Sequence, residues 1–531
     1  MSEPNKKSFN LIDEPWIPVA AEKELRSLRA IFSGTPPRDL SGNPVEKIVL
    51  FRFLLSIAHA SVTIADTDAW RQLTPQQLAE SACKYLDEHH ELFDLYDPEK
   101  PFLQFPKLAK MGKIEDCSTL KAEVATGNRS VLTAWSQAKN NTSIEKAMTL
   151  LCSCGYGRGG KKYDSSIVLT KGYIKGKTGK AGTLLGSYGY LHAYMKGEDL
   201  WESLKFNMFT EEEIKALKWY PAGMGRPCWE NMPAGEDDLR AKEYRNSYFG
   251  RIFPLDKFLL FKDNGVIKTD GISYLDSREN IPEPAITVFQ DGKDYKTIWA
   301  KTDKRPWRQL TALLSFLGDR SKYPYTISLA LQKLRGCPRK TITVWFGGAE
   351  VSSNSGEQYF SGKNDYIESV FSFPAEHMGS QEFSRFEDIM LKTEKTAKSL
   401  YVSVAEYHKQ MNNDLGADHA SRATTLFWEQ MEKRAQIIID IAFSENFSEE
   451  MEEAEIAEWR KLVYRIYDEI CPHSTARQMS AYVQANPRYR KAEKEKNKEK
   501  NKEKTQNKND TETKRSKAWK TNEMQQDLLP L

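Results

Sequence analysis

The sequence has few cysteines and no long uninterrupted hydrophobic run. Seven cysteines in 531 residues are a low and odd number, which excludes a small disulfide-stapled domain and fits a reducing compartment. The longest strongly apolar run, 48–58, is interrupted by Arg52 and is far shorter than the roughly 20 residues of a membrane-spanning helix. The polar stretch 1–8 leads into no signal-type apolar segment. We therefore expect a soluble, cytoplasmic protein.

A strong charge of one sign is also lacking over most of the chain. The net charge is +3, but residues 488–520 hold 14 Lys or Arg against 6 Asp or Glu, which leaves about −5 for the rest. A mildly acidic body repels phosphates on average, so any binding of nucleic acid must use local basic patches. Hydrophobic residues make up 40% of the chain, which is enough for a large core and excludes a mainly disordered protein.

The length predicts two or more domains. In the first part, Asn43-Pro44 before 45–59 predicts a capped helix, and the runs 285–290 and 295–300 around Asp291-Gly292 predict a β-hairpin. Residues 341–346 predict a strand that ends at Gly347-Gly348 and gives way to a polar loop. No βαβ periodicity and no internal repeat is visible.

After residue 374 the apolar residues follow helical spacing. Three long sets and one short set are joined by short loops, and they cover 386–411, 423–442, 456–470 and 476–483. Amphipathic helices with short connections favour an antiparallel four-helix bundle. Residues 491–520 are rich in Lys, Glu and Asn, which is typical of a solvated tail, and the alternative is a tail with weak, non-specific affinity for nucleic acid.

We therefore predict an α+β protein with three parts. They are a large mixed α/β domain over 1–378, an antiparallel four-helix bundle over 379–490 and a Lys-rich low-complexity tail over 491–531.

The stretch 155–180 is the best candidate for a binding site. It holds seven Lys or Arg, seven Gly, three Tyr and one acidic residue. Glycines let the backbone approach a phosphate, cations attract it and tyrosines offer a stacking surface. This predicts a localised nucleic-acid contact, and the alternative is a surface loop that is basic by chance. The candidate residues are Gly155, Tyr156, Gly157, Arg158, Gly159, Gly160, Lys161 and Lys162.

The same stretch is similar to a phosphate-binding loop of an NTPase, but the pattern is incomplete. Gly155, Gly160 and Lys161 have the right spacing, whereas Lys162 stands where a Ser or Thr must hold magnesium. A nucleotide-dependent or nuclease enzyme that uses this loop is the alternative to a non-enzymatic binding protein.

Metal sites are not indicated. Cys152 and Cys154 form one pair without a second pair, and the adjacent His89 and His90 point to different faces of their predicted helix. We predict neither a metal nor a cofactor.

Two short motifs carry a resemblance to a known family. Residues 9–19 read Phe-Asn-Leu-Ile-Asp-Glu-Pro-Trp-Ile-Pro-Val, and residues 101–104 read Pro-Phe-Leu-Gln. The first resembles the opening of the large subunit (CasA family) of the type I-E CRISPR surveillance complex, Cascade, and the second resembles another short signature of that family. The Gly-rich loop, the later strands and the C-terminal helices follow in the family's order, so the resemblance covers residues 9 to 490.

The resemblance implies a non-catalytic DNA-binding subunit. Such subunits bind target double-stranded DNA, recognise the protospacer-adjacent motif (PAM) and help open the duplex so that guide RNA can form an R-loop. The implied partners are target DNA, guide RNA, the other Cascade subunits and a recruited helicase-nuclease, with no membrane. The C-terminal helices are expected to be a docking and DNA-guiding platform, through the lysines of the first helix, Lys392, Lys395, Lys398 and Lys409.

The resemblance also implies roles for single positions. The family's Gly-rich loop falls on 155–159, with Arg158 where a glycine is common, and a nearby DNA-contacting loop falls on the stretch that includes Asn128 and Arg129. A wedge residue at the duplex fork is expected at Gln358, with Asn354 as the alternative residue, because an amide offers both a donor and an acceptor to unpaired bases. The alternative to a wedge is an ordinary hairpin loop.

Overall fold

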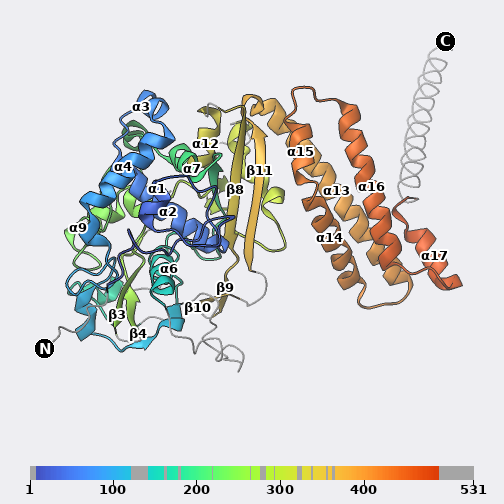
Figure 1. The fold of residues 1–531 in the computed structure, drawn as a ribbon. Helices are drawn as coiled ribbons and strands as arrows, with labels where there is room; N and C mark the ends of the chain where they lie inside the picture. Colours follow the sequence, from blue (N-terminus) through green and yellow to red (C-terminus); the bar gives the residue numbers. More distant parts are fainter. Residues whose placement is uncertain are drawn as a thin grey trace, which may run out of the picture. The chain divides into compact units, whose positions relative to one another are not determined.

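The computed structural model describes most of the chain except both termini and several loops. The chain divides into two compact units, Met1–Phe386 with Ala442–Glu445 and Glu387–Ile441 with Asn446–Leu531 (Figure 1). The predicted domain boundaries at 378 and 490 stay predictions. The described residues are 8–120, 142–160, 164, 166–176, 181–217, 219–262, 265–274, 283–291, 294–319, 326–336, 339–354, 357–360 and 365–488.

Helix α2 (Pro44–Ser61) is the central helix of the first unit. Asn43 and Glu46 cap each other's backbone N–H groups, and Pro44 occupies the first turn, a combination that starts a helix firmly. The helix is buried over most of its length and packs against α4 (Pro75–Glu88), α6 (Ser143–Gly155), α7 (Leu200–Asn207) and α10 (Phe249–Ile252). The predicted capped helix is confirmed.

The sheet beside α2 has three antiparallel strands in the order β11-β8-β2. They are β11 (Tyr366–Pro374), β8 (Thr341–Ala349) and β2 (His192–Lys196). The predicted strand is confirmed, but its predicted end is wrong, because Gly347 and Gly348 lie inside β8 and pair with β11. A Cβ on Gly347 would lie 2.1 Å from the Trp345 ring, so the glycine serves close packing within the strand.

The predicted polar loop after β8 contains a small hairpin. Strands β9 (Ser352–Asn354) and β10 (Glu357–Tyr359) pair antiparallel, with Gln358 opposite Ser353. This places Gln358 on a strand and not at a free loop tip.

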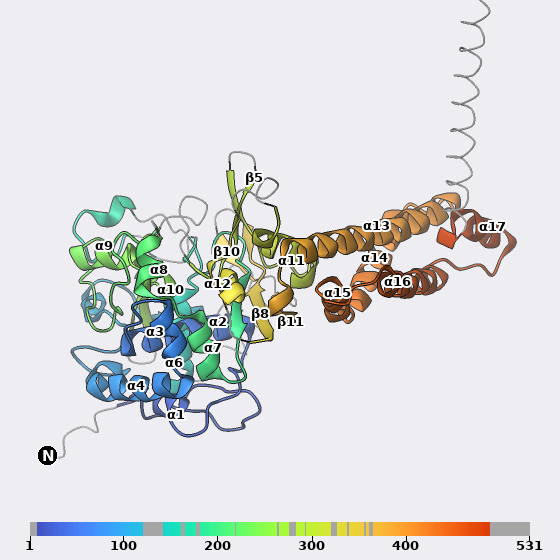
Figure 2. The ribbon, with the colours of Figure 1, turned by 90° about the horizontal axis from the view of Figure 1, so that it is seen from above.

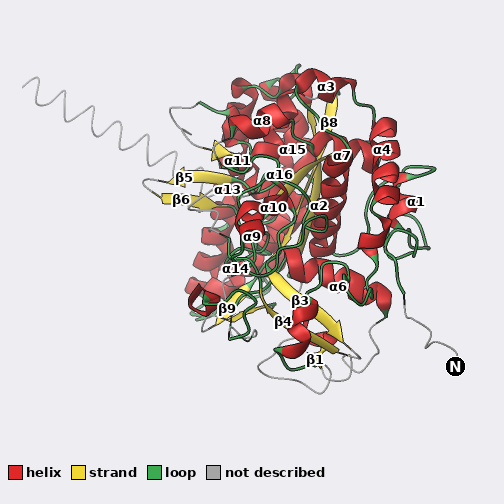
Figure 3. Ribbon diagram, turned by 90° about the vertical axis from the view of Figure 1, so that its left-hand side faces the viewer, coloured by secondary structure: helices red, strands yellow, loops and turns green. Residues whose placement is uncertain are grey.

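Two further antiparallel sheets complete the first unit (Figure 3). One has the order β1-β4-β3, and the other has the order β6-β5-β7. The predicted hairpin is confirmed by the pairing of β5 with β6. The strands are β1 (Glu115–Asp116), β3 (Lys257–Lys262), β4 (Gly265–Asp270), β5 (Val288–Asp291), β6 (Asp294–Thr297) and β7 (Thr326–Ile327).

Short helices connect these elements. The α-helices are α1 (Leu28–Phe32), α3 (Thr67–Gln72), α8 (Glu211–Ala216), α9 (Leu239–Arg245), α11 (Leu310–Leu313) and α12 (Leu329–Gln332). The 3-10 helices are η1 (His90–Phe93), η2 (Pro106–Lys110), η3 (Cys117–Leu120), η4 (Tyr173–Gly176), η5 (Pro306–Gln309), η6 (Ser315–Leu317), η7 (Lys333–Gly336) and η8 (Ala375–His377).

The second unit is helical (Figure 2). Helices cover all four predicted stretches, but the second predicted helix is two helices, because the chain turns at residues 433–434. Helix α14 packs against α16, and the antiparallel four-helix bundle stays a prediction. The helices are α13 (Ser380–Gln410), α14 (Gly416–Glu432), α15 (Ala435–Ala442), α16 (Glu449–Ile470) and α17 (Ala476–Ala485). No helix among the described residues is long and apolar enough to cross a membrane.

Candidate nucleic-acid interface

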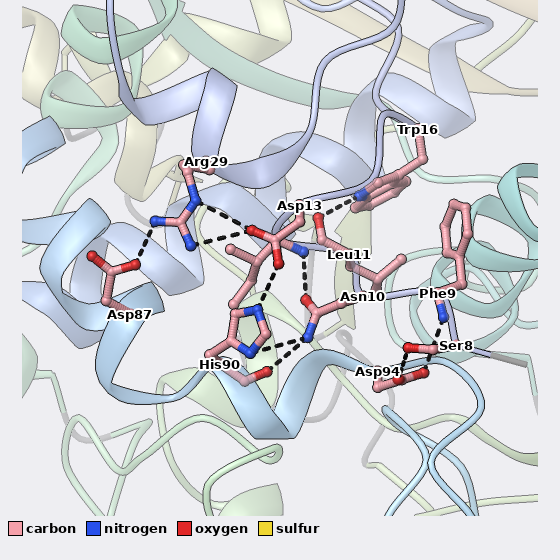
Figure 4. Close-up of polar contacts among 11 residues, drawn as sticks. Ser8, Phe9, Asn10, Leu11, Asp13, Trp16, Arg29, Asp87, His90 and Asp94 are labelled. Carbon is pink, nitrogen blue, oxygen red and sulfur yellow. Dashed lines mark hydrogen bonds and ion pairs between the residues drawn. The ribbon is translucent and has the colours of Figure 1, made fainter. Parts of the chain in front are cut away.

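The opening motif has a structural role (Figure 4). Asn10 Nδ2 donates a hydrogen bond to the backbone oxygen of His90 at 2.9 Å, and Asn10 Oδ1 accepts one from Ile12 N at 2.9 Å. The buried Trp16 donates its Nε1–H to the carbonyl of Leu11 at 2.9 Å. These contacts fix the first described segment of the chain against η1.

Ion pairs extend the same network. His90 Nε2 lies 2.6 Å from Asp13 Oδ2, and Arg29 bridges Asp13 and Asp87. The hydrogen bond from His90 is the main cause that lowers the pKa of the Asp13 carboxyl. His90 of η1 therefore has a partner in the opening motif, the Asp13 carboxyl. Among the described residues, no group of three or more His, Cys, Asp or Glu side chains is placed to hold a metal ion.

The second motif is also structural. The buried Gln104 donates to the Leu95 carbonyl at 2.8 Å and accepts from Phe261 N at 2.8 Å. Leu103 before it has φ +53°, a left-handed conformation that is rare for a bulky residue. The motif therefore ties the turn at 101–104 to strand β3.

The Gly-rich loop, residues 155–160, leaves the end of helix α6. A capping box of Thr142 and Glu145 starts this helix, and Tyr156 caps its C-terminus with a backbone bond to Cys152 O at 2.7 Å. A phosphate-binding loop of an NTPase instead connects a strand to the start of a helix. The geometry therefore does not match the nucleotide site that the Gly and Lys spacing imitates.

The loop is less exposed than the sequence suggested. Tyr156 is 5% exposed and lies near the His192 ring, and Arg158 is 4% exposed with Nη2 donating to Thr119 O at 3.5 Å. The expected stacking surface at Tyr156 is therefore buried in this structure, because the ring packs in the core. Gly160, with φ +111°, is only partly buried.

Gln358 holds the Gly-rich loop. Its Oε1 accepts from Gly159 N at 2.8 Å, and its backbone N donates to Gly159 O at 3.2 Å. Its Nε2 donates to the carbonyls of Gly186 and Ser187 at 2.9 and 2.8 Å. The side chain is 5% exposed, so in this structure the amide braces two loops and does not project outward. We call these contacts the Gln358 brace.

A second support lies under Gly157. Its carbonyl accepts from Gly182 N at 2.7 Å, and a Cβ on Gly182 would lie 2.3 Å from Asp256 Oδ2 and 2.9 Å from Gly157 N. Only glycine fits at residue 182. The Asp256 carboxylate accepts from Thr183 N at 2.9 Å and from Thr183 Oγ1 at 3.2 Å. Burial raises the pKa of Asp256 to about 8 and favours the protonated acid, whereas the charge of Lys257 and the two bonds from Thr183 favour the carboxylate.

Exposed cations and an aromatic ring lie next to the braced loops. The segment after β6 docks on residue 189 through a bond from Ala300 N to Gly189 O at 2.8 Å, and its Trp299 ring packs against Tyr188, which is 56% exposed. Lys301 and Lys304 follow and are exposed. The sequence reasoning missed this segment, although four cations within residues 301–308 were a detectable pattern.

The remaining predicted residues are only partly described. Asn354 ends β9 opposite Glu357, and the structure describes its backbone but not its side chain. Lys161, Lys162, Asn128 and Arg129 also lie outside the described residues. The structure thus brings together residues 155–160 and Gln358 and leaves the roles of all these residues as predictions.

The lysines predicted on the first C-terminal helix differ from one another. Lys392 forms an ion pair with Glu452 of α16, so its charge is neutralised locally. Lys395, Lys398 and Lys409 are exposed on α13. The basic face is therefore made by three of the four predicted lysines.

Comparison with solved structures places the fold among CRISPR-associated proteins. Cse1 of Thermobifida fusca matches with a TM-score of 0.72 at 17% identity, over 91% of this chain and 97% of that chain. CasA of Thermus thermophilus matches with a TM-score of 0.65 at 18% identity, over 90% of this chain and 98% of that chain. Cse1 of Acidimicrobium ferrooxidans matches with a TM-score of 0.66 at 16% identity, over 92% and 98%.

Sequence comparison then gives the family. Residues 10–470 match the family described as CRISPR-associated protein Cse1, and the chain belongs to this family. The protein described as CRISPR-associated protein CasA/Cse1 of Thermus thermophilus is 31% identical over 343 residues. That match covers 59% of this chain and 62% of the relative's length. The resemblance seen in the opening motif is thereby confirmed.

Proposed function

We propose that the chain is the non-catalytic large subunit of an RNA-guided type I-E CRISPR surveillance complex. Membership of the Cse1 family supports this proposal, and so does the fold shared with a chain of a structure described as a CRISPR RNA-guided surveillance complex, with a TM-score of 0.64. The proposed partners are guide RNA, the other subunits of the complex, target double-stranded DNA and a helicase-nuclease. The helices α13 to α17 are proposed to form an antiparallel four-helix bundle that helps to dock this nuclease.

In this role the subunit recognises the PAM and helps to open the duplex. The observation that carries the proposal is the Gly-rich loop, which is fixed by the Gln358 brace beside the exposed Tyr188, Lys301 and Lys304. A rigid loop can read a groove by shape, while neighbouring cations hold the phosphates. Lys161, Lys162, Asn128 and Arg129 are proposed to add contacts to the same duplex.

Phosphate contacts are tested by charge reversal in the assembled complex. Lys301→Glu combined with Lys304→Glu should weaken binding of all duplexes and reduce the salt slope by about one per lost contact. The control is Lys84→Glu combined with Lys110→Glu, which changes exposed lysines on other elements. Equal binding by the two double variants would remove the segment 299–304 from the interface.

The enzyme alternative is tested on the purified protein. Purified protein with ATP, magnesium and duplex DNA should neither release phosphate nor cut the DNA, because the loop that imitates a nucleotide site leaves a helix and gives the Gly159 N–H to Gln358. Turnover that is lost in Lys161→Ala would establish the enzyme instead.

A further inference from the structure

A groove runs between helices α13 and α16 in the second unit. Its volume is about 640 Å³, within the range of small-molecule sites. Its lining comes from one face of each helix and from Pro487, which follows α17. Lys395 and Lys398 on its rim belong to the basic face of α13 described above, but the groove between the helices has no part in the proposed function.

The groove has a basic rim. It is lined by four cations and one carboxylate. The cations are Lys392, Lys395, Lys398 and Arg460, and the carboxylate is Glu453. Arg460 pairs with Glu453 at 2.7 Å, and Lys392 pairs with Glu452. Among the described residues, Lys395 and Lys398 form no ion pair, and both are exposed. The two lysines lie three positions apart on α13, which puts neighbouring side chains on one helix face.

The groove also contains a buried hydroxyl without a partner. Ser403 is 1% exposed, and its Oγ makes no hydrogen bond within the described structure. Thr393 and Thr396 on the same helix instead donate their hydroxyls to the carbonyls of Ile389 and Lys392. An unsatisfied buried polar group is unfavourable, so a polar ligand in the groove would restore the missing bond.

The opposite side of the groove is apolar and aromatic. Ile456, Val463 and the Tyr464 ring of α16 line it. The Arg488 guanidinium lies 4.5 Å from the centre of the Tyr464 ring and 3.6 Å from an oxygen of Asp468. A planar ring can pack against such a wall, as bases do on aromatic platforms.

We propose that this groove binds one nucleotide unit, with the base in the groove and the phosphate at the rim. The base packs against Val463 and Tyr464, its edge bonds with Ser403, and Lys395 and Lys398 hold the phosphate. An amphipathic helix of a partner protein fits less well, because an apolar side chain in the groove leaves the Ser403 hydroxyl unpaired. The inference goes beyond the proposed function, since it requires neither recognition of a motif nor opening of a duplex.

The same nucleotide chemistry has two sources, a free mononucleotide and a single DNA strand. Both are tested on the full chain by photocrosslinking, with free 5-iodo-dUMP in one arm and a short single strand that contains 5-iododeoxyuridine in the other. Mass spectrometry then locates the adducts. Adducts in the Lys-rich residues 491–520 are distinguished from an adduct in the groove by their position in the sequence. We expect an adduct on Tyr464.

Variants test each part of the groove. Lys395→Glu combined with Lys398→Glu should reduce the Tyr464 adduct about tenfold, which corresponds to ~1.4 kcal/mol of binding. Ser403→Ala removes the hydroxyl with little change in volume, and Val402→Trp fills the groove without changing its charge, so both should also reduce the adduct. Lys433→Glu changes the charge of an exposed lysine after α14, outside the groove, and should leave the yield unchanged. Circular dichroism checks that each variant keeps its helix content.

The outcomes separate the alternatives. A Tyr464 adduct in both arms supports a site for free nucleotides, and an adduct with the strand alone supports a site for single-stranded DNA. The absence of this adduct from both arms, which a groove made for a protein helix would give, overturns the proposal. It is also overturned if Val402→Trp leaves the adduct yield unchanged. Neither result bears on PAM recognition, which is measured separately with duplex DNA.

Discussion

Removal of the Gln358 amide should release the Gly-rich loop. In Gln358→Ala, Gly159 N loses its acceptor, and the carbonyls of Gly186 and Ser187 lose their donor. Each hydrogen bond contributes a net ~0.5–1.5 kcal/mol, and each buried group left unpaired costs about 1–3 kcal/mol. Because water can reach the carbonyls once the side chain is cut back, we expect a local loss of about 2–3 kcal/mol.

Native-state hydrogen exchange measures this local loss. The Gly159 N–H should exchange roughly 30- to 140-fold faster in Gln358→Ala, since each 1.4 kcal/mol corresponds to a factor of ten. The control is Gln76→Ala, which removes an exposed side-chain bond to Glu80 on α4. Unchanged protection of Gly159 in Gln358→Ala would refute the brace.

Gln358→Glu separates the two ends of the amide. The carboxylate can still accept from Gly159 N, but it has no hydrogen to offer the carbonyls of Gly186 and Ser187. We therefore expect Gln358→Glu to lose at least as much protection as Gln358→Ala. If Gln358→Glu instead retains full protection, the bonds from Nε2 contribute nothing and only the acceptor matters.

Binding assays on the assembled complex distinguish a brace from a wedge. A brace positions the loop before any base pair opens, so Gln358→Ala should weaken binding equally on a closed target and on a target with a pre-opened bubble. A wedge acts on the first base pairs, so its loss should slow R-loop formation on the closed target alone. Subunit assembly must be intact in both measurements.

Three further predictions concern the support of the loop and the core. Gly182→Ala should lower the melting temperature, because its Cβ would lie 2.3 Å from Asp256 Oδ2 and such overpacking costs about 1–3 kcal/mol. Burial raises the pKa of Asp256 to about 8, so the folded state binds the extra proton and unfolding free energy should fall as pH rises from about 4 to about 8; Asp256→Asn should flatten this dependence in urea titrations. Arg52→Met should destabilise the protein by about 3–5 kcal/mol, because it leaves the buried Glu283 without its ion-pair partner. Urea titrations should show a smaller loss of stability when Arg52→Met is combined with Glu283→Gln.

Local sequence patterns predicted the elements that depend on local physics. Asn43-Pro44 marked the start of α2, and Asp291-Gly292 marked the hairpin of β5 and β6. Caps and turns depend on residues only a few positions apart, so a single sequence shows them. The end of β8 was missed, because glycine weakens a strand and the pairing that extends β8 through Gly347 and Gly348, with β11 and β2, joins residues far apart in the sequence.

The sequence named the residues of the candidate site, whose role stays a prediction, but not the way in which they are packed. Charge and glycine content identified residues 155–160, yet burial of Arg158 and Tyr156 depends on the elements packed around the loop. The Gln358 brace joins residues 199 positions apart, and Asp256 meets Thr183 across 73 positions. Contacts over such distances follow from the tertiary fold, which local patterns in one sequence do not contain.

The brace and the wedge that the family resemblance leads us to expect place opposite demands on the Gln358 side chain. While Gln358 holds Gly159, its amide cannot insert into a duplex. A bracing energy of about 2–3 kcal/mol leaves the amide free in roughly one molecule in 30 to 140. Within the proposed function, an acceptor group of the DNA takes the hydrogen bond of the Gly159 N–H in place of Gln358. This lowers the bracing energy and raises the fraction of molecules in which the Gln358 amide is free. If the proposal holds, contact at the Gly-rich loop and release of the amide form one coupled equilibrium, and we expect opening of the duplex to depend on prior recognition at the loop.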